Sequence, residues 1–384
     1  MRIALIGGVL FLVGLVAIAT GALPLPAVGE LAERVVPILV FVVAITIVAE
    51  LAAEAGVFRA LAEWLADVAR GRGWLLWVLV VVLATLSTVF LSLDTTAVLL
   101  TPIVIALAQH ARISPIPLAL TTVWLANTGS LLLPVSNLTN LLAAHELGGM
   151  TPLAFAAITW APALVAVVVP AAVIFATRPR QIVARYTPEH ATPVADRTLF
   201  LISAIVVALL IPAFVSGVEV WIPASIAAVI LIGVFAVRKR SVLEFRLVPW
   251  QLVVFAGGLF LVMEAAHSIG ATDVLAAVAG TGRSPLDLLQ LAGAGATSAN
   301  LINNLPAYLA LEPFAGDPVR LVALLIGVNA GAIITPWGSL ATLLWHERLV
   351  AMGVEISWVK FMLLGLVAAP LTVVAAVLAL SLTA

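Results

Sequence analysis

Long apolar stretches recur along the whole chain, and they restrict its fold more than any other feature. A membrane-spanning helix needs about 20 mostly apolar residues, and about ten stretches of this length lie in the sequence. The composition agrees, because 64% of the 384 residues are hydrophobic and only 10% are charged, against about 25% charged in a soluble domain. We therefore predict an all-α polytopic membrane protein.

The net charge and the missing residue types narrow the class further. A formal net charge of −1 gives no indication of nucleic-acid binding, and the absence of cysteine excludes disulfides and thiolate metal sites. The five histidines are scattered without the spacing of a metal site, so we expect neither a metal nor a cofactor. The apolar run at residues 3–19 is longer than the core of a signal peptide, which predicts a retained span.

Proline, glycine and charged residues divide the apolar stretches into candidate helices. These are predicted at residues 3–22, 35–53, 74–92, 95–109, 116–133, 152–176, 198–215, 219–237, 249–267, 286–302, 318–334 and 357–381. Residues 57–70 show an amphipathic pattern, and such a helix usually lies along the membrane surface.

The two halves of the chain resemble each other around two polar segments. Residues 127–142 align without gaps on residues 329–344, with six identities in sixteen positions, and Glu50 matches Glu264 upstream. The alternative is chance similarity between apolar segments. The shared order and the placement of polar residues favour a duplication.

Basic residues indicate how the halves cross the membrane. If residues 74–109 and 286–312 each form a hairpin that enters and leaves on one side, fifteen of the 18 Lys and Arg residues fall on one face. The positive-inside rule makes that face cytoplasmic. The two hairpins then enter from opposite sides, as in the inverted repeats of secondary transporters. If both hairpins are instead pairs of full spans, the halves have the same orientation.

These patterns predict a multi-pass protein of the bacterial inner membrane, with a cytoplasmic N-terminus and an external C-terminus. Its fold is an inverted structural repeat with two re-entrant hairpins and two broken transmembrane helices. The expected parts are an N-terminal extra span (1–34), a first repeat (35–176) with a hairpin (74–109) and a broken helix (116–147), a cytoplasmic linker (177–197), and a second repeat (198–384) with a hairpin (286–312) and a broken helix (318–347).

Four polar clusters, at residues 92–102, 134–140, 298–306 and 335–342, interrupt the apolar stretches, and each combines proline with Ser, Thr or Asn. Non-helical backbone survives at membrane depth only where it is buried in protein or lines a cavity, so the clusters predict broken helices around a polar site. Their half-helix N-termini offer free N–H groups to a solute. The alternative is that the polar side chains only join neighbouring helices. With the repeat-matched Asn127 and Asn329, the candidate substrate-binding residues are Asp94, Thr95, Thr96, Ser136, Asn137, Thr139, Asn140, Asn303, Asn304, Thr335, Gly338, Ser339 and Thr342.

Asp94 is the only acidic residue in these clusters. A carboxylate at mid-membrane costs roughly 2.5–3.5 kcal/mol on insertion scales, so its presence requires a reason. Such an acid can bind and release a proton during transport, which predicts a proton-coupling role. The alternative is a helix cap, because Asp followed by two Thr residues starts helices well. Glu50 and Glu264 are further candidates for proton coupling, and the alternative is that each lies near the end of a span, in the water of the lipid headgroups.

Several segments also carry a family pattern, namely LDTTAVLLTPIVIALA, PVSNLTN, NNLP, and TPWGSLATLLW followed by EISW. In order and over nearly the whole chain, they resemble the bacterial arsenite/antimonite efflux permeases. These permeases belong to the ion-transporter superfamily, with the divalent-anion:sodium symporters and citrate transporters. The resemblance implies a scaffold that forms dimers and a transport domain of two hairpins and two broken helices that moves as an elevator.

The resemblance further implies which residues line the site. These are the hairpin tips and the loops at residues 136–137 and 338–339. The chain departs from the family pattern in two places, because Leu93 stands where the first tip usually has asparagine, and amides at Asn127 and Asn329 replace acidic residues.

We therefore predict a proton-coupled secondary transporter that exports arsenite or antimonite. The neutral trihydroxide needs hydroxyl and amide partners rather than fixed cations, and the four clusters contain no Lys or Arg. The expected partners are the lipid bilayer, arsenite or antimonite or a small anion, protons or sodium, a second copy in a homodimer and, as in some arsenite permeases, a separate ATPase subunit; nucleic acid is not among them.

Other functions stay open at this point. One is a sodium- or proton-coupled carrier of small organic or inorganic anions such as dicarboxylates or citrate, which helix N-termini could hold. Another is an intramembrane enzyme, which is disfavoured because Asp94 has no second aspartate in a matching motif and no Ser–His pairing is evident. A third is a channel, although inverted repeats with broken helices favour alternating access.

Overall fold

The long helices of the chain account for its membrane character. The computed structural model describes residues 2–187, 194–270 and 275–383, and within these ranges the regular structure is helical apart from one isolated backbone bridge. Eight of the described helical segments are long and apolar enough to cross a membrane. The longest helices are α1 (Arg2–Ala19), α2 (Leu25–Glu54), α4 (Gly73–Leu91), α9 (Pro152–Thr177), α11 (Arg197–Val215), α12 (Trp221–Arg238), α13 (Trp250–Ser268), α15 (Pro285–Ile302) and α19 (Trp358–Thr383). The prediction of an all-α polytopic membrane protein is confirmed.

Two predicted helices are informative in their details. The helix expected at 35–53 begins ten residues earlier, at Leu25, because Pro26 fits in its first turn, where a missing N–H costs nothing. The amphipathic segment forms α3 (Val57–Ala69), which buries Phe58 and Leu65 but exposes Trp64.

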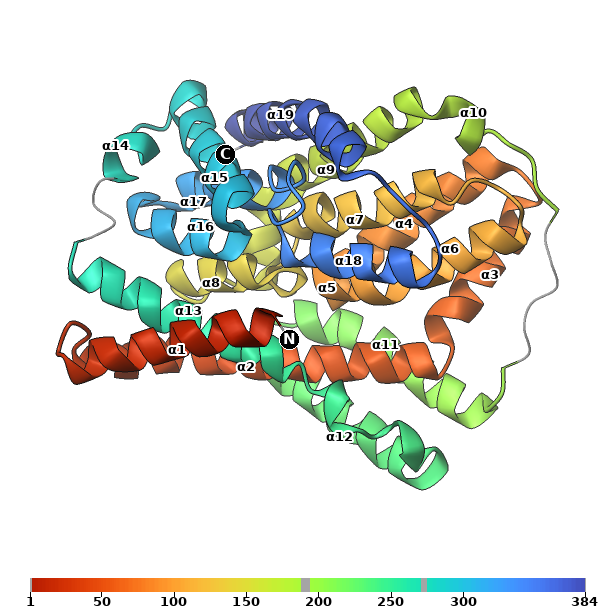
Figure 1. Ribbon diagram of the computed structural model, residues 1–384, viewed down its shortest axis with the longest axis horizontal. Helices are drawn as coiled ribbons and strands as arrows, with labels where there is room; N and C mark the ends of the chain where they lie inside the picture. The colour runs from red at the N-terminus through yellow and green to blue at the C-terminus, as the bar shows by residue number, and fades with distance from the viewer. Residues whose placement is uncertain (1, 188–193, 271–274, 384) are drawn as a thin grey trace.

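Two helical hairpins occupy the predicted regions. The first consists of α4, α5 (Leu93–Thr95), a π-helical turn η1 (Thr96–Leu100) and α6 (Thr101–His110); the second consists of α15, α16 (Asn304–Leu311) and η7 (Glu312–Phe314). Their tips meet the middle of the molecule from opposite ends (Figure 1).

Two further helices are interrupted in the middle. The first break separates α7 (Ile116–Thr128) from α8 (Leu138–Glu146) and contains the short turns η2 (Gly129–Leu131) and η3 (Pro134–Ser136). The second lies between α17 (Pro318–Leu325), which continues through a π-helical turn η8 (Ile326–Ala330), and α18 (Leu340–Ala351). Short segments complete the described fold: α10 (Pro179–Ile182), η4 (Arg240–Val242), η5 (Phe245–Leu247) and α14 (Ala276–Ala279).

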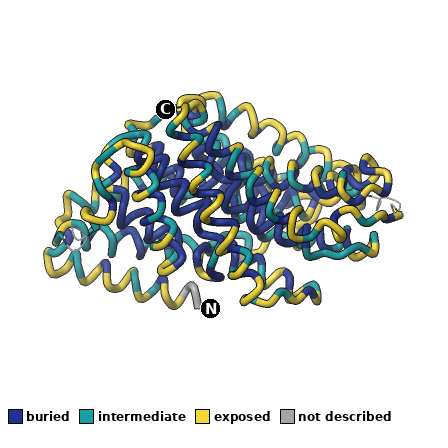
Figure 2. The backbone as a smooth tube through the Cα atoms, turned by 90° about the horizontal axis from the view of Figure 1, so that it is seen from above, coloured by how far each residue is buried: buried dark blue, intermediate teal, exposed yellow. Residues whose placement is uncertain are grey.

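The helices form two groups. Helices α1, α2, α11, α12 and α13 pack together along one side, the lower side in Figure 1, and the hairpins and broken helices pack with α9 and α19 on the other. Buried backbone concentrates in the middle of the molecule, whereas the outer helices carry most of the exposed residues (Figure 2). The polar breaks therefore lie within the best-shielded part of the protein.

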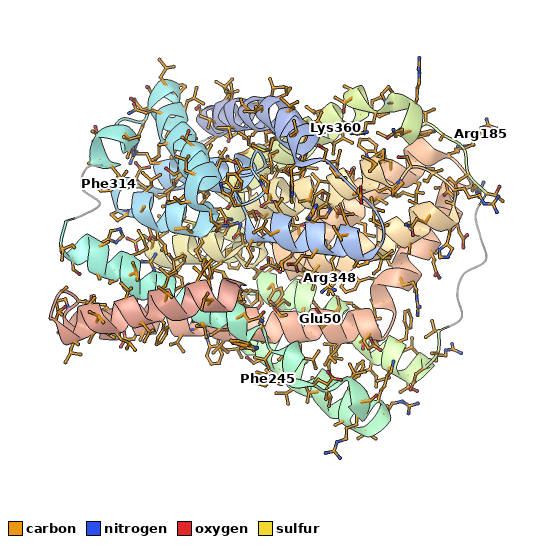
Figure 3. The ribbon with its side chains drawn as sticks, viewed as in Figure 1. Glu50, Arg185, Phe245, Phe314, Arg348 and Lys360 are labelled. Atoms are coloured by element: carbon orange, nitrogen blue, oxygen red, sulfur yellow. The ribbon has the colours of Figure 1, made fainter. Side chains whose placement is uncertain are left out.

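The two ends of the molecule carry different charged residues. Arg34 pairs with Glu312, and Arg283 pairs with Asp317, at the end where the second hairpin starts and finishes. Arg185 lies at the opposite end, and Phe314 at the end of the second hairpin (Figure 3). The linker predicted at 177–197 and the C-terminal Ala384 lie partly or wholly outside the described residues.

An ion pair outside the apolar spans also joins two helices. Arg238 at the end of α12 contacts Asp196, which caps α11, and this hydrogen bond lowers the pKa of the Asp196 carboxyl. Its pairing holds the exposed ends of these two helices together.

Candidate functional site

Each of the four breaks starts a half-helix at a polar residue. These residues are Ser92 before α5, Asn137 before α8, Asn303 before α16 and Ser339 before α18. The first three accept a hydrogen bond from a backbone N–H of the following turn, whereas Ser339 makes no such bond. Caps of this kind satisfy N–H groups that a helix start leaves unpaired.

The two hairpin tips share one unusual backbone conformation. Ser92 has φ 100° and ψ 160°, and Asn303 has φ 96° and ψ 153°. This region is almost restricted to glycine and costs a non-glycine residue of order 1–3 kcal/mol. Two such residues at corresponding places in two hairpins indicate that the tips are shaped for a function rather than for stability.

Asn329 forms the centre of a buried amide network between the two broken helices. Its Oδ1 accepts hydrogen bonds from Asn137 Nδ2 at 2.9 Å and Thr139 Oγ1 at 3.0 Å. Its Nδ2 donates to Asn140 Oδ1 at 3.0 Å. All four side chains are at most 3% exposed. Asn329 lies in a π-helical turn, a distortion frequent at functional sites, so the turn presents it to the other break.

The first broken helix is held in its unwound form by its own side chains. Asn140 Nδ2 donates to the carbonyl oxygens of Ser130 at 2.6 Å and Leu133 at 3.1 Å. Ser136 Oγ donates to the Leu133 carbonyl at 2.6 Å and is 3.3 Å from the carbonyl of Val89 in the first hairpin. The polar residues of PVSNLTN thus pair backbone groups that the break would otherwise leave unsatisfied.

Asn300 ties the second hairpin to the second break. Its Nδ2 donates to the Gly331 carbonyl at 2.8 Å, and its Oδ1 accepts from the Thr335 N–H at 2.9 Å. A Cβ added at Gly338 would lie 2.9 Å from Asn300 Oδ1, so glycine lets these two segments approach closely. At the tip, the Asn304 N–H donates to the Gly338 carbonyl at 2.9 Å, and Asn303 Nδ2 donates to the Trp337 carbonyl at 3.1 Å.

Hydroxyl groups stabilise the tip of the first hairpin. Thr88 Oγ1 donates to Thr96 Oγ1 at 2.9 Å, and Thr96 Oγ1 donates to Ser87 Oγ at 3.0 Å. Thr95 Oγ1 donates to the Leu91 carbonyl at 2.9 Å. Thr95 and Thr96 therefore hold the hairpin together. This agrees with the alternative that the polar side chains of the clusters join neighbouring helical segments.

Three predicted residues have buried polar atoms without a hydrogen-bond partner among the described residues. These atoms are Asn127 Oδ1, Ser339 Oγ and Thr342 Oγ1, and all three residues are fully buried. Ser339 and Thr342 lie three residues apart at the start of α18, on one face of the helix. Buried polar groups are nearly always paired, so unpaired ones call for a partner such as a solute.

Asp94 lines a cavity of about 240 Å³ together with Glu50 and Arg348. The remaining wall includes Thr46 and Thr95 and apolar side chains of α2, α13 and α18. Glu50 and Arg348 lie near the centre of the molecule in Figure 3. Asp94 and Glu50 thus share one cavity, and Arg348 adds a positive charge that sequence distance did not reveal.

Glu264 lines a second cavity, of about 210 Å³, on the side of the second hairpin. Arg34, Glu146 and Glu312 also line it, and Arg34 forms ion pairs with Glu146 and Glu312. Continuing the alignment of the two segments by four residues brings Glu146 opposite Arg348, and Glu50 matches Glu264 upstream of the segments. Each hairpin therefore has a charged cavity beside it, but Glu264 lies away from the cavity of Asp94.

The predicted residues thus fall into separate groups. Asn329 bonds to Asn137, Thr139 and Asn140. In the second group, Thr335 bonds to Asn300 and Gly338 lies close to it, while Asn303 and Asn304 bond to the Trp337 and Gly338 carbonyls of the same break. Sequence reasoning missed Asn300, Arg348 and Ser130. The match of Arg348 with Glu146 in the repeat is the signal that could have singled it out.

This architecture defines a class of protein. Opposed hairpins and broken helices around a buried polar centre are the arrangement found in secondary membrane transporters. Comparison with known proteins agrees with this class. The sequence profile of the citrate transporter family matches residues 3–317, which is most of the chain.

Two similar proteins are named arsenical pump membrane proteins. The chain is 30% identical over 350 residues to an arsenical pump membrane protein of Yersinia enterocolitica, covering 85% of this chain and 81% of the relative. It is 29% identical over 349 residues to an arsenical pump membrane protein of Escherichia coli (strain K12), with the same coverage. The chain belongs to the citrate transporter family of the ion-transporter superfamily, and it is a transporter rather than an enzyme.

A solved structure supports the fold. The YdaH transporter of Alcanivorax borkumensis, whose crystal structure is described as having an unusual topology, aligns with a TM-score of 0.57. The alignment covers 94% of this chain and 89% of that chain at 17% identity. At this identity the likeness concerns the fold alone.

Proposed function

We propose that the protein is a secondary active transporter that exports arsenite or antimonite as the neutral trihydroxide, driven by protons. The observation that carries this proposal is the buried centre between the broken helices, where amides and hydroxyls meet without a charged partner among their described hydrogen bonds. The names of the arsenical pump relatives support the same substrate.

The unpaired polar atoms suit a trihydroxide. Such a solute both donates and accepts hydrogen bonds through its hydroxyl groups. Asn127 Oδ1 accepts, whereas Ser339 Oγ and Thr342 Oγ1 donate and accept, and all three are buried without a partner among the described residues. We assign Ser339 and Thr342 as the first contacts of the solute because they lie together at a helix start.

Proton coupling is assigned to Asp94. Its carboxyl lines the cavity beside the first hairpin, where Glu50 and Arg348 form the rest of the charged wall. Protonation of Asp94 changes the charge balance with Arg348. Because a charged group at this depth is costly, the proton state of Asp94 biases the position of the hairpin.

The movement is assigned to an elevator. Helices α1, α2, α11, α12 and α13 form the stationary scaffold of this proposal, and the hairpins and broken helices form the moving part in an inverted repeat. The ion pair between Arg34 of α2 and Glu312 of the second hairpin joins the two parts, so it must open when the hairpin moves.

The test compares two buried hydroxyls. Ser339→Ala removes a proposed substrate contact, while Ser203→Ala removes an equally buried and unpaired hydroxyl on α11 of the scaffold. Loss of one hydrogen bond of about 0.5–1.5 kcal/mol weakens the apparent affinity for arsenite by up to about tenfold. Arsenite exchange in everted membrane vesicles should show this loss for Ser339→Ala only. Equal behaviour of the two variants would remove Ser339 from the site.

A second candidate function is the transport of small organic or inorganic anions. It is favoured by the position of Arg348 in the cavity of Asp94 and by the citrate transporter family itself. The two functions differ in whether they need the positive charge of Arg348. Arg348→Gln should abolish the transport of an anion such as citrate, while a carrier of neutral arsenite keeps its affinity for the solute.

A further inference from the structure

Two arginines face each other at the end of the molecule opposite the base of the second hairpin. The turn before α4 forms a short antiparallel contact with the linker, in which Arg72 lies directly opposite Arg185. The Gly73 N–H donates to the Ala184 carbonyl and the Tyr186 N–H donates to the Gly71 carbonyl, both at 3.1 Å. Because the two hydrogen bonds join the neighbouring residues, Arg72 and Arg185 form a non-hydrogen-bonded antiparallel pair. In such a pair the Cα atoms are about 4.5 Å apart and the side chains lie close together.

The neighbouring residues fix this contact. The buried Tyr186 donates its hydroxyl to the Ala66 carbonyl of α3 at 2.7 Å, and burial raises the pKa of this phenol to about 12, so it stays protonated. A Cβ at Gly73 would lie 2.1 Å from the Ala184 carbonyl oxygen, so only glycine allows the approach. The backbone therefore imposes the arginine pair.

Neither arginine of the pair has an ion-pair partner within the described part of the chain. Like charges directly opposite each other destabilise an antiparallel pair. None of the ion pairs of the described residues includes Arg72 or Arg185, and the first turn of α4 has no acidic residue. Both side chains are exposed, and Figure 3 shows Arg185 at the end of the molecule. An anion placed between the two guanidinium groups would turn this repulsion into a binding site.

Apolar residues beside the pair indicate where that anion comes from. Trp74, two residues after Arg72, is 45% exposed, and Val183, two residues before Arg185, is 51% exposed. Tryptophan is enriched at the membrane–water interface, and arginine attracts the anionic phosphates of that interface. We propose that Arg72 and Arg185 together bind the phosphate of an anionic phospholipid, with Trp74 and Val183 against the upper part of its acyl chains.

This lipid site is independent of the transported substrate. Because the linker and the start of the first hairpin supply one arginine each, a bound phosphate joins them. The lipid thereby strengthens the contact that holds the linker to the base of the hairpin. A lipid that binds only the folded protein stabilises it by RT ln(1 + [L]/Kd), so the stability rises with lipid concentration.

Thermal unfolding of the full-length protein in neutral detergent tests the proposal. Addition of phosphatidylglycerol should raise the apparent Tm, whereas phosphatidylcholine should leave it unchanged. In Arg72→Gln and Arg185→Gln this rise should be lost. Arg240→Gln, which removes an exposed arginine with the same change in net charge, should keep it.

Two results carry further weight. Without lipid, Arg72→Gln should be at least as stable as the unaltered protein, because the repulsion is relieved; a lower Tm together with a retained lipid response would overturn the proposal. If inorganic phosphate at millimolar concentration raises the Tm as much as phosphatidylglycerol does, the site takes a free phosphate and the lipid assignment is wrong.

Discussion

Removal of the Asn329 side chain should uncouple the two broken helices. Asn329→Ala breaks three hydrogen bonds, to Asn137, Thr139 and Asn140, each of which connects segments about 190 positions apart in the chain. Polar contacts between helices in a membrane protein contribute about 0.6 kcal/mol each, which gives a loss of about 2 kcal/mol. The matched control is Asn127→Ala at the corresponding position of the first half, where the side chain donates one hydrogen bond to Val123 of its own helix.

The assay is the fraction of folded protein after heating in detergent, measured by size-exclusion chromatography. Asn329→Ala should show the larger decrease in apparent Tm, and Asn127→Ala a decrease of about one third of that size. With Asn137→Ala in the same chain, Asn329→Ala should cost less than it does alone, because the two residues share a bond. Equal losses in the two single variants, or strict additivity in the double variant, would refute the network as a structural connection.

Three further outcomes are expected. Asp94→Asn should still exchange arsenite across vesicles without a gradient but should fail to accumulate it when a pH difference is imposed; full accumulation would reassign the proton to Glu50 or Glu264. Cysteines that replace Arg34 and Glu312 in this cysteine-free chain should stop transport when they are cross-linked. A cross-link between cysteines at Arg283 and Asp317, both within the proposed moving part, should not stop it. Active protein with the first cross-link would contradict the elevator. Arg240 is one of the fifteen basic residues predicted on the cytoplasmic face, so a cysteine at this position should react with an impermeant thiol reagent only after the cells are opened; labelling of intact cells would contradict that orientation.

Local patterns made the helices and their breaks predictable. Hydropathy marks a span, and Pro or Gly beside Ser, Thr and Asn marks a break, because backbone groups at membrane depth need partners. The structure shows half-helices that start after Ser92, Asn137, Asn303 and Ser339, all within the predicted clusters. The start of α2 was missed because charged residues near its N-terminus resemble a loop until their distant partners are known. Arg34, for example, pairs with Glu312.

The contacts between distant segments were not predictable in the same way. Asn137 and Asn329 were both candidates, but nothing local shows that they bond to each other. Asn300 lies inside a predicted cluster, yet its role depends on how closely Gly338 approaches it. Arg348 was overlooked because it lies far from Asp94 in sequence, although packing places both around one cavity. Sequence therefore identified the polar residue types, and the fold determined their partners.

The substrate of the buried centre is the central claim, and uptake into everted membrane vesicles tests it most directly. Vesicles that contain the protein, acidified inside, should accumulate arsenite, and a protonophore should abolish the accumulation. Excess citrate should not compete, because the centre offers hydroxyls and amides rather than a fixed cation. Vesicles that accumulate citrate, and in which arsenite neither accumulates nor competes, would contradict the proposal and establish the anion carrier in its place.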